Sequence, residues 1–215
     1  MKQIYDQIAP EFNATRQNLW PELLEFKKYL NDDQNILDLG CGNGRLIHLL
    51  KEFKINYTGS DISSDLLNYA KNQDFGKIMN FKFIESDMIN LDFEDNSFDI
   101  IFLIASLHHL NTKVDRIKML TNIEKWLKPN GFVIMTNWNL FQKKYIKHIF
   151  NIHKRSWNDF LIPWKDKNGN VLVKRFYHGF RTKELEKLLE KSDLTLVKNS
   201  FSELKKNIIT IASKT

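Results

Sequence analysis

The 215-residue chain is long enough to bury one hydrophobic core, and its 42% hydrophobic and 27% charged residues exclude a wholly disordered protein. No apolar run approaches the ~20 residues that a membrane-spanning helix needs, and the opening residues lack the apolar core of a signal peptide, so we expect a cytoplasmic protein without a membrane partner. The single Cys41 excludes an internal disulfide, and the formal net charge of +6 raises the question of where the positive residues lie.

Residues 1–30 are expected to form a helical lid that packs on the rest of a single domain spanning residues 1–215. From residue 35, short apolar runs alternate with amphipathic stretches in the order NILDLG, GRLIHLLKEF, NYTGSDI and SSDLLNYAKNQDF. This alternation predicts a βαβα order, which is typical of an α/β fold with a parallel sheet and helices on both faces.

The pattern continues with the strand FKFIESD, the apolar run FDIIFLIASL, a helix from about Val114 to Leu127 and the strand GFVIMTNW. A strand covered on both faces is apolar throughout, so FDIIFLIASL is expected near the centre of the sheet. Thr112 and Asp115 have the spacing of a capping box at the start of the helix that precedes KPNG.

Residues 139–181 show no clean periodicity, and we interpret them as a basic, aromatic insertion before the helix TKELEKLLEKS and the strands LTLVKNSF and NIITIASKT. Residues 140–183 carry eleven Lys/Arg against Asp159 and Asp166, a local charge of +9 in a chain whose remainder sums to −3. Such a segment would suit a phosphate backbone with stacked bases, while a plain solvated surface is the alternative. The interleaved aromatic residues are Phe141, Tyr145, Phe150, Trp157, Phe160, Trp164, Phe176 and Tyr177.

The segment DLGCGNGR follows a predicted strand and precedes a predicted helix, with glycines at positions 40, 42 and 44. Glycines there permit a tight turn and a close approach of backbone to ligand. A dinucleotide fingerprint would need glycine where Arg45 stands, which disfavours NAD. A nucleoside-triphosphate loop is excluded because no Gly-Lys-Ser/Thr follows.

This loop resembles that of the class I methyltransferases, which passes under S-adenosylmethionine (AdoMet). The resemblance implies a Rossmann-like sheet, mostly parallel with an antiparallel last strand, and AdoMet as the cofactor. It further implies that Asp61 grips the two ribose hydroxyls, and that Asp87 takes the adenine amino group while Ile62 and Met88 flank the ring. The implied cofactor-binding set is Asp38, Gly40, Cys41, Gly42, Gly44, Asp61, Ile62, Asp87, Met88 and Ile104.

A narrower resemblance is carried by IASLHHL, FNATRQNLWP, NWNLFQ, LIPWK and RFYHGF followed by ELEKLL. Together these segments, from about Tyr5 to Leu189, are similar to the tRNA wobble-uridine carboxyl methyltransferases, whose domain is fused in animals to an AlkB-like oxygenase. That family carries two arginines after the histidines, whereas here only Arg116 follows Asp115. The resemblance implies the anticodon region of tRNA as a partner and admits a small zinc-binding activator protein as a second one.

Those enzymes esterify 5-carboxymethyluridine, and the chemistry suits the residues. A carboxylate with a pKa near ~4 is already ionised at pH 7, so it attacks a sulfonium methyl group without a general base, and positioning is the main task. Two adjacent histidines without a third ligand make a poor metal site, and no metal is expected. The residues implied in positioning the acceptor are Arg16, His108, His109, Arg175, Tyr177 and His178.

Other interpretations stay open at this point. The two histidines are alternatively loop residues packed under the lid, and Arg16 alternatively pairs with an acid of the sheet domain. The acceptor is alternatively a small-molecule carboxylate or hydroxyl, and the chain alternatively a tRNA-binding relative without turnover.

Overall fold

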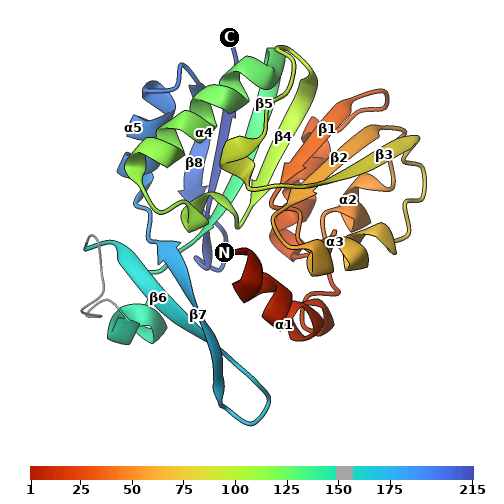
Figure 1. Ribbon diagram of the computed structural model, residues 1–215. Helices are drawn as coiled ribbons and strands as arrows, with labels where there is room; N and C mark the ends of the chain where they lie inside the picture. The colour runs from red at the N-terminus through yellow and green to blue at the C-terminus, as the bar shows by residue number, and fades with distance from the viewer. Residues whose placement is uncertain (149–156) are drawn as a thin grey trace.

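A seven-stranded sheet forms the centre of the protein (Figure 1). The structure is a computed structural model and describes residues 1–148 and 157–215. The strands lie side by side in the order β3-β2-β1-β4-β5-β9-β8. Their bounds are β1 Asn35–Leu39, β2 Asn56–Asp61, β3 Asn80–Glu85, β4 Phe98–Ile104, β5 Leu127–Trp138, β8 Thr195–Phe201 and β9 Asn207–Ser213.

The strands from β3 to β5 pair in parallel, and β9 pairs antiparallel with both β5 and β8. The predicted mostly parallel sheet with an antiparallel last strand is therefore confirmed. β4 lies in the middle of the sheet and is almost entirely buried, as its unbroken apolar sequence predicts.

Alternate residues of the central strands feed two separate cores, because successive side chains point to opposite faces of a sheet. Ile101 and Leu103 of β4 pack in one core with α4 and α5, whereas Ile100 and Phe102 pack in the other with α2 and η1. Figure 1 shows α4 and α5 together on one face of the sheet. The helices that build these layers are α1 Lys2–Ala14, η1 Pro21–Tyr29, α2 Ile47–Leu50, α3 Ser64–Lys71, η2 Met88–Asn90, η3 Leu107–His109, α4 Lys113–Trp126, η4 Lys143–His148 and α5 Thr182–Glu190.

Two helices begin where side chains cap them. The hydroxyl of Thr112 accepts the N–H of Asp115 at 3.0 Å and donates to its carboxylate at 2.6 Å, which confirms the predicted capping box of α4. The hydroxyl of Ser63 accepts the N–H of Leu66 at 3.2 Å and starts α3 directly after β2.

The helix expected over GRLIHLLKEF is much shorter than predicted, since α2 contains only Ile47–Leu50. Gly44 has φ +79°, outside the helical region, so no helix begins there. After Lys51 the chain turns back toward β2, with the N–H of Phe53 donating to Leu50 O at 3.0 Å.

The basic segment between β5 and α5 contains an antiparallel hairpin of β6 Asp159–Lys165 and β7 Val171–His178, which lies outside the main sheet. No strand was predicted there. Phe150, Lys154 and Arg155, which were counted in the basic aromatic segment, lie outside the described residues.

Helix α1 and the β6–β7 hairpin lie below the same edge of the sheet, opposite the C-terminus (Figure 1). Parallel strands point their carboxyl ends to one edge, so both elements stand next to the residues that follow β1, β2 and β4. Among the described helices, none is long and apolar enough to cross a membrane.

Candidate active site

A cavity of about 220 Å³ opens where β1, β2 and β4 end. One wall is formed by the residues after these strands, including the glycine loop. The opposite wall comes from α1 and the hairpin, through Tyr5, Phe12, Arg175 and Tyr177. Ligands of open α/β sheets bind outside the carboxyl ends of the strands, so this cavity is the candidate active site.

The glycine loop turns tightly at the cavity floor. Gly40 and Gly42 have φ of +74° and +56°, conformations that favour glycine, and both line the cavity. The N–H groups of Gly40 and Cys41 donate to Ser60 O at 2.8 and 2.9 Å, which ties the loop to the end of β2. A Cβ at position 40 would lie 2.7 Å from the Cβ of Ser106, so only glycine lets the loop approach the residues after β4 this closely.

Gly44 does not line the cavity. A Cβ there would lie 2.9 Å from Ile47 Cδ1 and 3.1 Å from Ala70 Cα. The third glycine of the motif therefore serves the packing of the loop against α3 rather than contact with a ligand.

Asp61 is the last residue of β2, Asp87 follows β3, and both line the cavity. The Asp61 carboxylate accepts the N–H of Gly42 at 2.8 Å and that of Ser63 at 2.9 Å. Burial raises the pKa of Asp61 to about 6, although these N–H bonds oppose the rise. Each carboxylate oxygen has a second lone pair, so Asp61 can still accept from a ligand. Asp87 accepts the N–H of Ile89 at 3.3 Å, which starts η2.

Three polar atoms under the loop are buried without a hydrogen-bond partner in the described part of the chain: Asp38 Oδ1, Ser60 Oγ and Ser106 Oγ. The other Asp38 oxygen accepts from the Tyr57 hydroxyl at 3.1 Å. Burial raises the pKa of Asp38 to about 7. Buried polar atoms normally have partners, so these atoms suggest a polar ligand on this side of the cavity.

Apolar side chains complete this half: Ile62, Met88 and Ile104 line the cavity next to Cys41. Burial raises the pKa of the Cys41 thiol well above its ordinary value, so the thiol stays protonated. A protonated thiol is a poor nucleophile, and Cys41 is suited to packing only.

Two arginines face the cavity from the hairpin and from the end of α1. The guanidinium carbon of Arg175 lies 4.6 Å from the ring centre of Trp164 and 5.1 Å from that of Tyr177, and its Nε has no hydrogen-bond partner among the described residues. Arg16 lies over Trp164 at 4.5 Å and over Phe12 at 4.6 Å. Neither arginine forms a salt bridge within residues 1–148 and 157–215, so the alternative that Arg16 pairs with an acid finds no support there.

The adjacent histidines make different contacts. His108 is buried, and its Nδ1 accepts the backbone N–H of Trp138 at 3.4 Å, which leaves Nε2–H without a partner. His109 Nδ1 lies 2.9 Å from Phe176 O, which can only accept, so Nδ1 donates and Nε2 accepts from the Tyr5 hydroxyl at 2.8 Å. Burial lowers the pKa of His109 to about 3 and that of His108 well below its ordinary value, so both rings are neutral.

Tyr177 and His178 are neighbours in β7 that point in different directions. Tyr177 lines the cavity and stacks on Trp138 with 5.1 Å between ring centres. His178 does not reach the cavity; its Nδ1 lies 2.7 Å from Asp159 Oδ1 and its Nε2 lies 2.8 Å from Glu184 Oε1. It joins the hairpin to α5.

The sequence interpretation did not single out Tyr5, although it lines the cavity and bonds His109. Tyr5, Ile8, Ala9 and Phe12 follow the i, i+3, i+4, i+7 spacing of an apolar helix face, so the sequence carried a signal that Tyr5 is buried. It carried no signal for a partner 104 residues away.

The cavity thus has two chemically different halves. The half under the glycine loop presents hydrogen-bond acceptors, from Asp38, Asp61 and Asp87. The half under the hairpin presents donors and positive charge, from Arg16, Arg175 and His108 Nε2.

The family model described as "Methyltransferase domain" matches residues 30–194, which include the glycine loop, the strand-end acids and the hairpin. The chain belongs to this methyltransferase family. The prediction of a methyltransferase from the glycine loop and the two strand-end acids is confirmed.

Similar curated proteins have a more specific name. The chain is 36% identical over 135 residues to the tRNA (carboxymethyluridine(34)-5-O)-methyltransferase of Arabidopsis thaliana, a match covering 63% of this chain and 31% of that protein. It is 28% identical over 161 residues to the protein of the same name from Saccharomyces cerevisiae, covering 75% of this chain and 54% of that protein. The resemblance inferred from the sequence is confirmed, and the chain corresponds to part of these methyltransferases.

Solved structures agree on the fold. A SAM-dependent methyltransferase from Methanosarcina mazei is 26% identical with a TM-score of 0.69, covering 92% of this chain and 98% of that one. The methyltransferase in a complex with the Haloferax volcanii Trm112 activator is 16% identical with a TM-score of 0.67, covering 99% and 96%, and shares the fold alone.

Proposed function

We propose that this methyltransferase transfers the methyl group of AdoMet to the carboxylate of 5-carboxymethyluridine at the wobble position of tRNA, and so forms a methyl ester. The observation that carries the proposal is the division of the cavity into an acceptor half and a donor half. AdoMet offers hydroxyl and amino donors and a positively charged sulfonium, whereas the substrate offers an anion. Each half fits one of the two molecules.

The acceptor half fits AdoMet on its own chemistry. The free lone pairs of Asp61 would accept the ribose hydroxyls, and Asp87 would accept the adenine amino group between Ile62 and Met88. The unpartnered Asp38 Oδ1 and the hydroxyls of Ser60 and Ser106 would gain partners from the polar groups of such a ligand.

When bound, AdoMet supplies an electrophilic methyl group: a carboxylate oxygen bonds to the methyl carbon while the carbon–sulfur bond breaks and its electron pair returns to sulfur. No proton moves in this reaction, which suits two histidines whose lowered pKa makes them weak bases. The protein's task is to hold the carboxylate in line. Arg175 and Arg16 would grip one oxygen by charge-assisted hydrogen bonds and leave the other free to react.

The surface of the insertion supports a tRNA substrate. Lys143, Lys144, Lys165, Lys167 and Lys174 are exposed, and none forms a salt bridge within the described ranges. Unpaired cations are free to contact phosphates. Of the insertion's aromatic rings, Trp157 is 82% exposed and so open to stacking, whereas Phe160, Trp164 and Tyr177 are buried.

Two further points belong to the proposal. The protein works in the cytoplasm on the anticodon region of tRNA. A small zinc-binding activator is its second partner, since eukaryotic and archaeal members of the family it resembles need one and a similarly folded methyltransferase forms a complex with the Trm112 activator.

Transfer of labelled methyl from AdoMet tests the proposal directly. Label should enter tRNA that carries 5-carboxymethyluridine, be released by mild base as an ester should, and not enter the same tRNA with unmodified uridine. Asp61→Ala should weaken AdoMet binding at least ~10-fold, through loss of charged hydrogen bonds, while sparing tRNA binding. No transfer in the presence of the activator would contradict the proposal, and label in a small-molecule carboxylate would favour the alternative acceptor.

A further inference from the structure

Helix α1 contacts both halves of the cavity. In the donor half, the Tyr5 hydroxyl donates to His109 Nε2 at 2.8 Å, and the two rings pack edge to face with 5.6 Å between centres. Tyr5 and Phe12 of the same helix line the cavity. The helix therefore covers the site rather than standing beside it.

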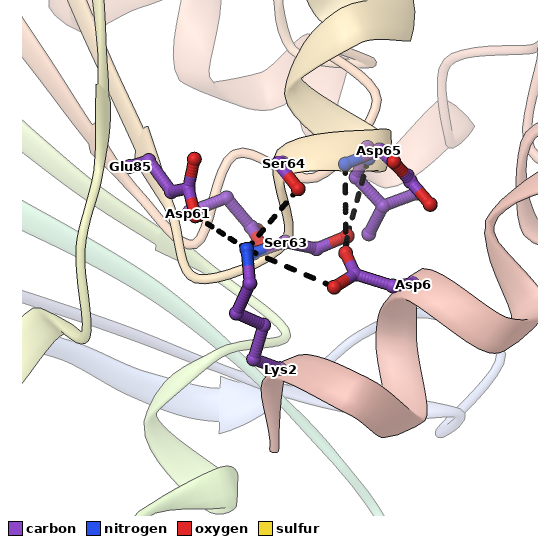
Figure 2. Close-up of polar contacts among 8 residues, drawn as sticks. Lys2, Asp6, Asp61, Ser63, Ser64, Asp65 and Glu85 are labelled. Carbon is purple, nitrogen blue, oxygen red and sulfur yellow. Dashed lines mark hydrogen bonds and ion pairs between the residues drawn. The ribbon is translucent and has the colours of Figure 1, made fainter.

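The N-terminal turn of α1 is anchored on the AdoMet side (Figure 2). The Asp6 carboxylate accepts from the Ser63 hydroxyl at 2.6 Å, and the Ser63 N–H donates to Asp61. The Lys2 ammonium reaches Ser64 at 3.1 Å and also bonds Glu85. Figure 2 shows these groups converging on the start of α3 and the end of β3.

On its own, α1 is a weak helix. It has 13 residues, no side-chain cap at its start, no acid in its first turn and Pro10 inside it. Isolated helices of this length are marginal in water, so tertiary contacts must hold α1 in place.

Neither ring nitrogen of His109 is free to bond a substrate, because Nδ1–H donates to Phe176 O and Nε2 accepts from the Tyr5 hydroxyl. His108 is the opposite case: the residue lines the cavity, and its buried Nε2–H has no partner among the described residues. Both rings contact Tyr177, at 5.0 Å and 4.6 Å between centres.

We propose that Tyr5 and His109 are positioning residues that latch α1 over the cavity, and that His108 alone of the two histidines donates a hydrogen bond to the bound acceptor. The assignment of His108 rests on the proposed function, since it requires an acceptor with oxygen atoms. The latch does not. Asp6 of the same helix also bonds Ser63, whose N–H donates to Asp61. The latch therefore couples the donor half of the cavity, where the substrate would bind, to the acceptor half, where AdoMet would bind.

Hydrogen exchange of the α1 amides in the full chain, measured by mass spectrometry without tRNA, tests the latch. Tyr5→Phe removes the Tyr5–His109 hydrogen bond and keeps the phenyl ring, whereas His109→Phe removes that bond together with the one to Phe176 O on the hairpin. Each should raise the exchange rate of residues 2–14 by roughly threefold to tenfold, the effect of one hydrogen bond. Adding Tyr5→Phe to His109→Phe should raise α1 exchange no further, because the Tyr5–His109 bond is already absent.

Matched variants separate the latch from general loosening. His109→Gln should restore slow exchange, because an amide can donate to Phe176 O and accept from Tyr5. His108→Phe and Tyr29→Phe should leave α1 exchange unchanged, since Tyr29 packs on Phe132 in the η1 layer. AdoMet affinity should fall with α1 protection in Tyr5→Phe, whereas His108→Phe should lower kcat/KM for tRNA at unchanged AdoMet affinity.

The latch is overturned if Tyr5→Phe exchanges like the wild type, or if Tyr5→Phe raises α1 exchange as much in the His109→Phe background as it does alone. If His109→Phe fails to fold, the comparison of α1 exchange rates between Tyr5→Phe and Tyr29→Phe still tests the latch. An inactive protein with the expected exchange pattern would count against the tRNA proposal and leave the latch standing. An active protein with unchanged exchange would overturn the latch alone.

Discussion

Arg175 places a positive charge in an aromatic pocket, where its Nε lacks a partner and no carboxylate pairs with it in the described residues. Such a charge is costly to bury unless a ligand supplies the counter-charge. The residue is therefore expected to act on the acceptor and not on AdoMet.

Arg175→Gln should lower kcat/KM for tRNA by roughly 10-fold to 150-fold, the loss of a hydrogen bond to a charged group, while AdoMet affinity by calorimetry stays unchanged. Arg181→Gln is the matched control, because it removes one exposed positive charge close by in the sequence. Equal losses in the two variants would show that Arg175 acts only through net charge.

Asp38 predicts a pH effect on stability in the ligand-free protein. Its folded-state pKa of about 7 lies above the ~3.9 of an unfolded chain, so its contribution is fully present below pH ~4 and is lost as pH rises through about 7. Asp38→Asn cannot ionise and can still accept from Tyr57. Its free energy of unfolding, from denaturant titrations, should match the wild type at pH ~4 and exceed it by up to about 4 kcal/mol at pH 8. The same gain at both pH values would contradict this origin.

At the scale of elements, the β6–β7 hairpin is held to α5 by His178 between Asp159 and Glu184. Burial is the largest single influence and opposes ionisation of Glu184, but His178, Arg116 and the Arg181 N–H together outweigh it and lower the pKa of that carboxyl. His178→Ala should reduce the free energy of unfolding by about 3 kcal/mol, because the buried Asp159 and the partly exposed Glu184 both lose their histidine partner, and should not change AdoMet affinity. Unchanged stability with reduced turnover would instead place His178 in acceptor binding, as the sequence resemblance implied.

The parallel strands and their order of helices were predictable because each depends on a local pattern of apolar residues. The hairpin was not predicted, because Pro163 lies inside β6 and disfavours a strand. The signal that would have found it is Asn168-Gly169 between two apolar runs, a dipeptide typical of hairpin turns, and Gly169 indeed has φ +87°.

Across the described residues of the whole molecule, some lysines form ion pairs with carboxylates and others do not. Lysines outside the insertion such as Lys27, Lys51 and Lys128 bind carboxylates, whereas the exposed lysines of the hairpin do not. The salt dependence of tRNA binding should therefore come mainly from the hairpin.

Replacing Lys165, Lys167 and Lys174 with glutamine should flatten the slope of log affinity against log salt by about 2, at ~0.7 for each phosphate that a lysine no longer neutralises. The triple variant of Lys27, Lys51 and Lys128 makes the same change in net charge and should leave the slope nearly unaltered. Affinity measured by fluorescence anisotropy over a salt series decides, and similar slopes for the two variants would contradict binding of tRNA by the hairpin.

Local sequence patterns predicted the residues of one half of the cavity but not those of the other. The glycine loop, Asp61 and Asp87 follow consecutive strands, so their convergence follows from the parallel sheet. Arg175 and Tyr177 were named only through a family resemblance, since no local pattern places a hairpin beside the end of β4. The Tyr5–His109 bond joins residues far apart in the sequence, and only the packed structure brings them together.

The positions of the chain ends have a practical consequence for work at the bench. Met1 lines the cavity, while the last strand runs away from it to the far edge of the sheet (Figure 1). An affinity tag or fluorescent reporter attached before Met1 would obstruct the cavity, whereas one attached after Thr215 would lie away from it. Comparing the AdoMet affinity of the two tagged forms would show how strongly the position of helix α1 controls access to the cavity.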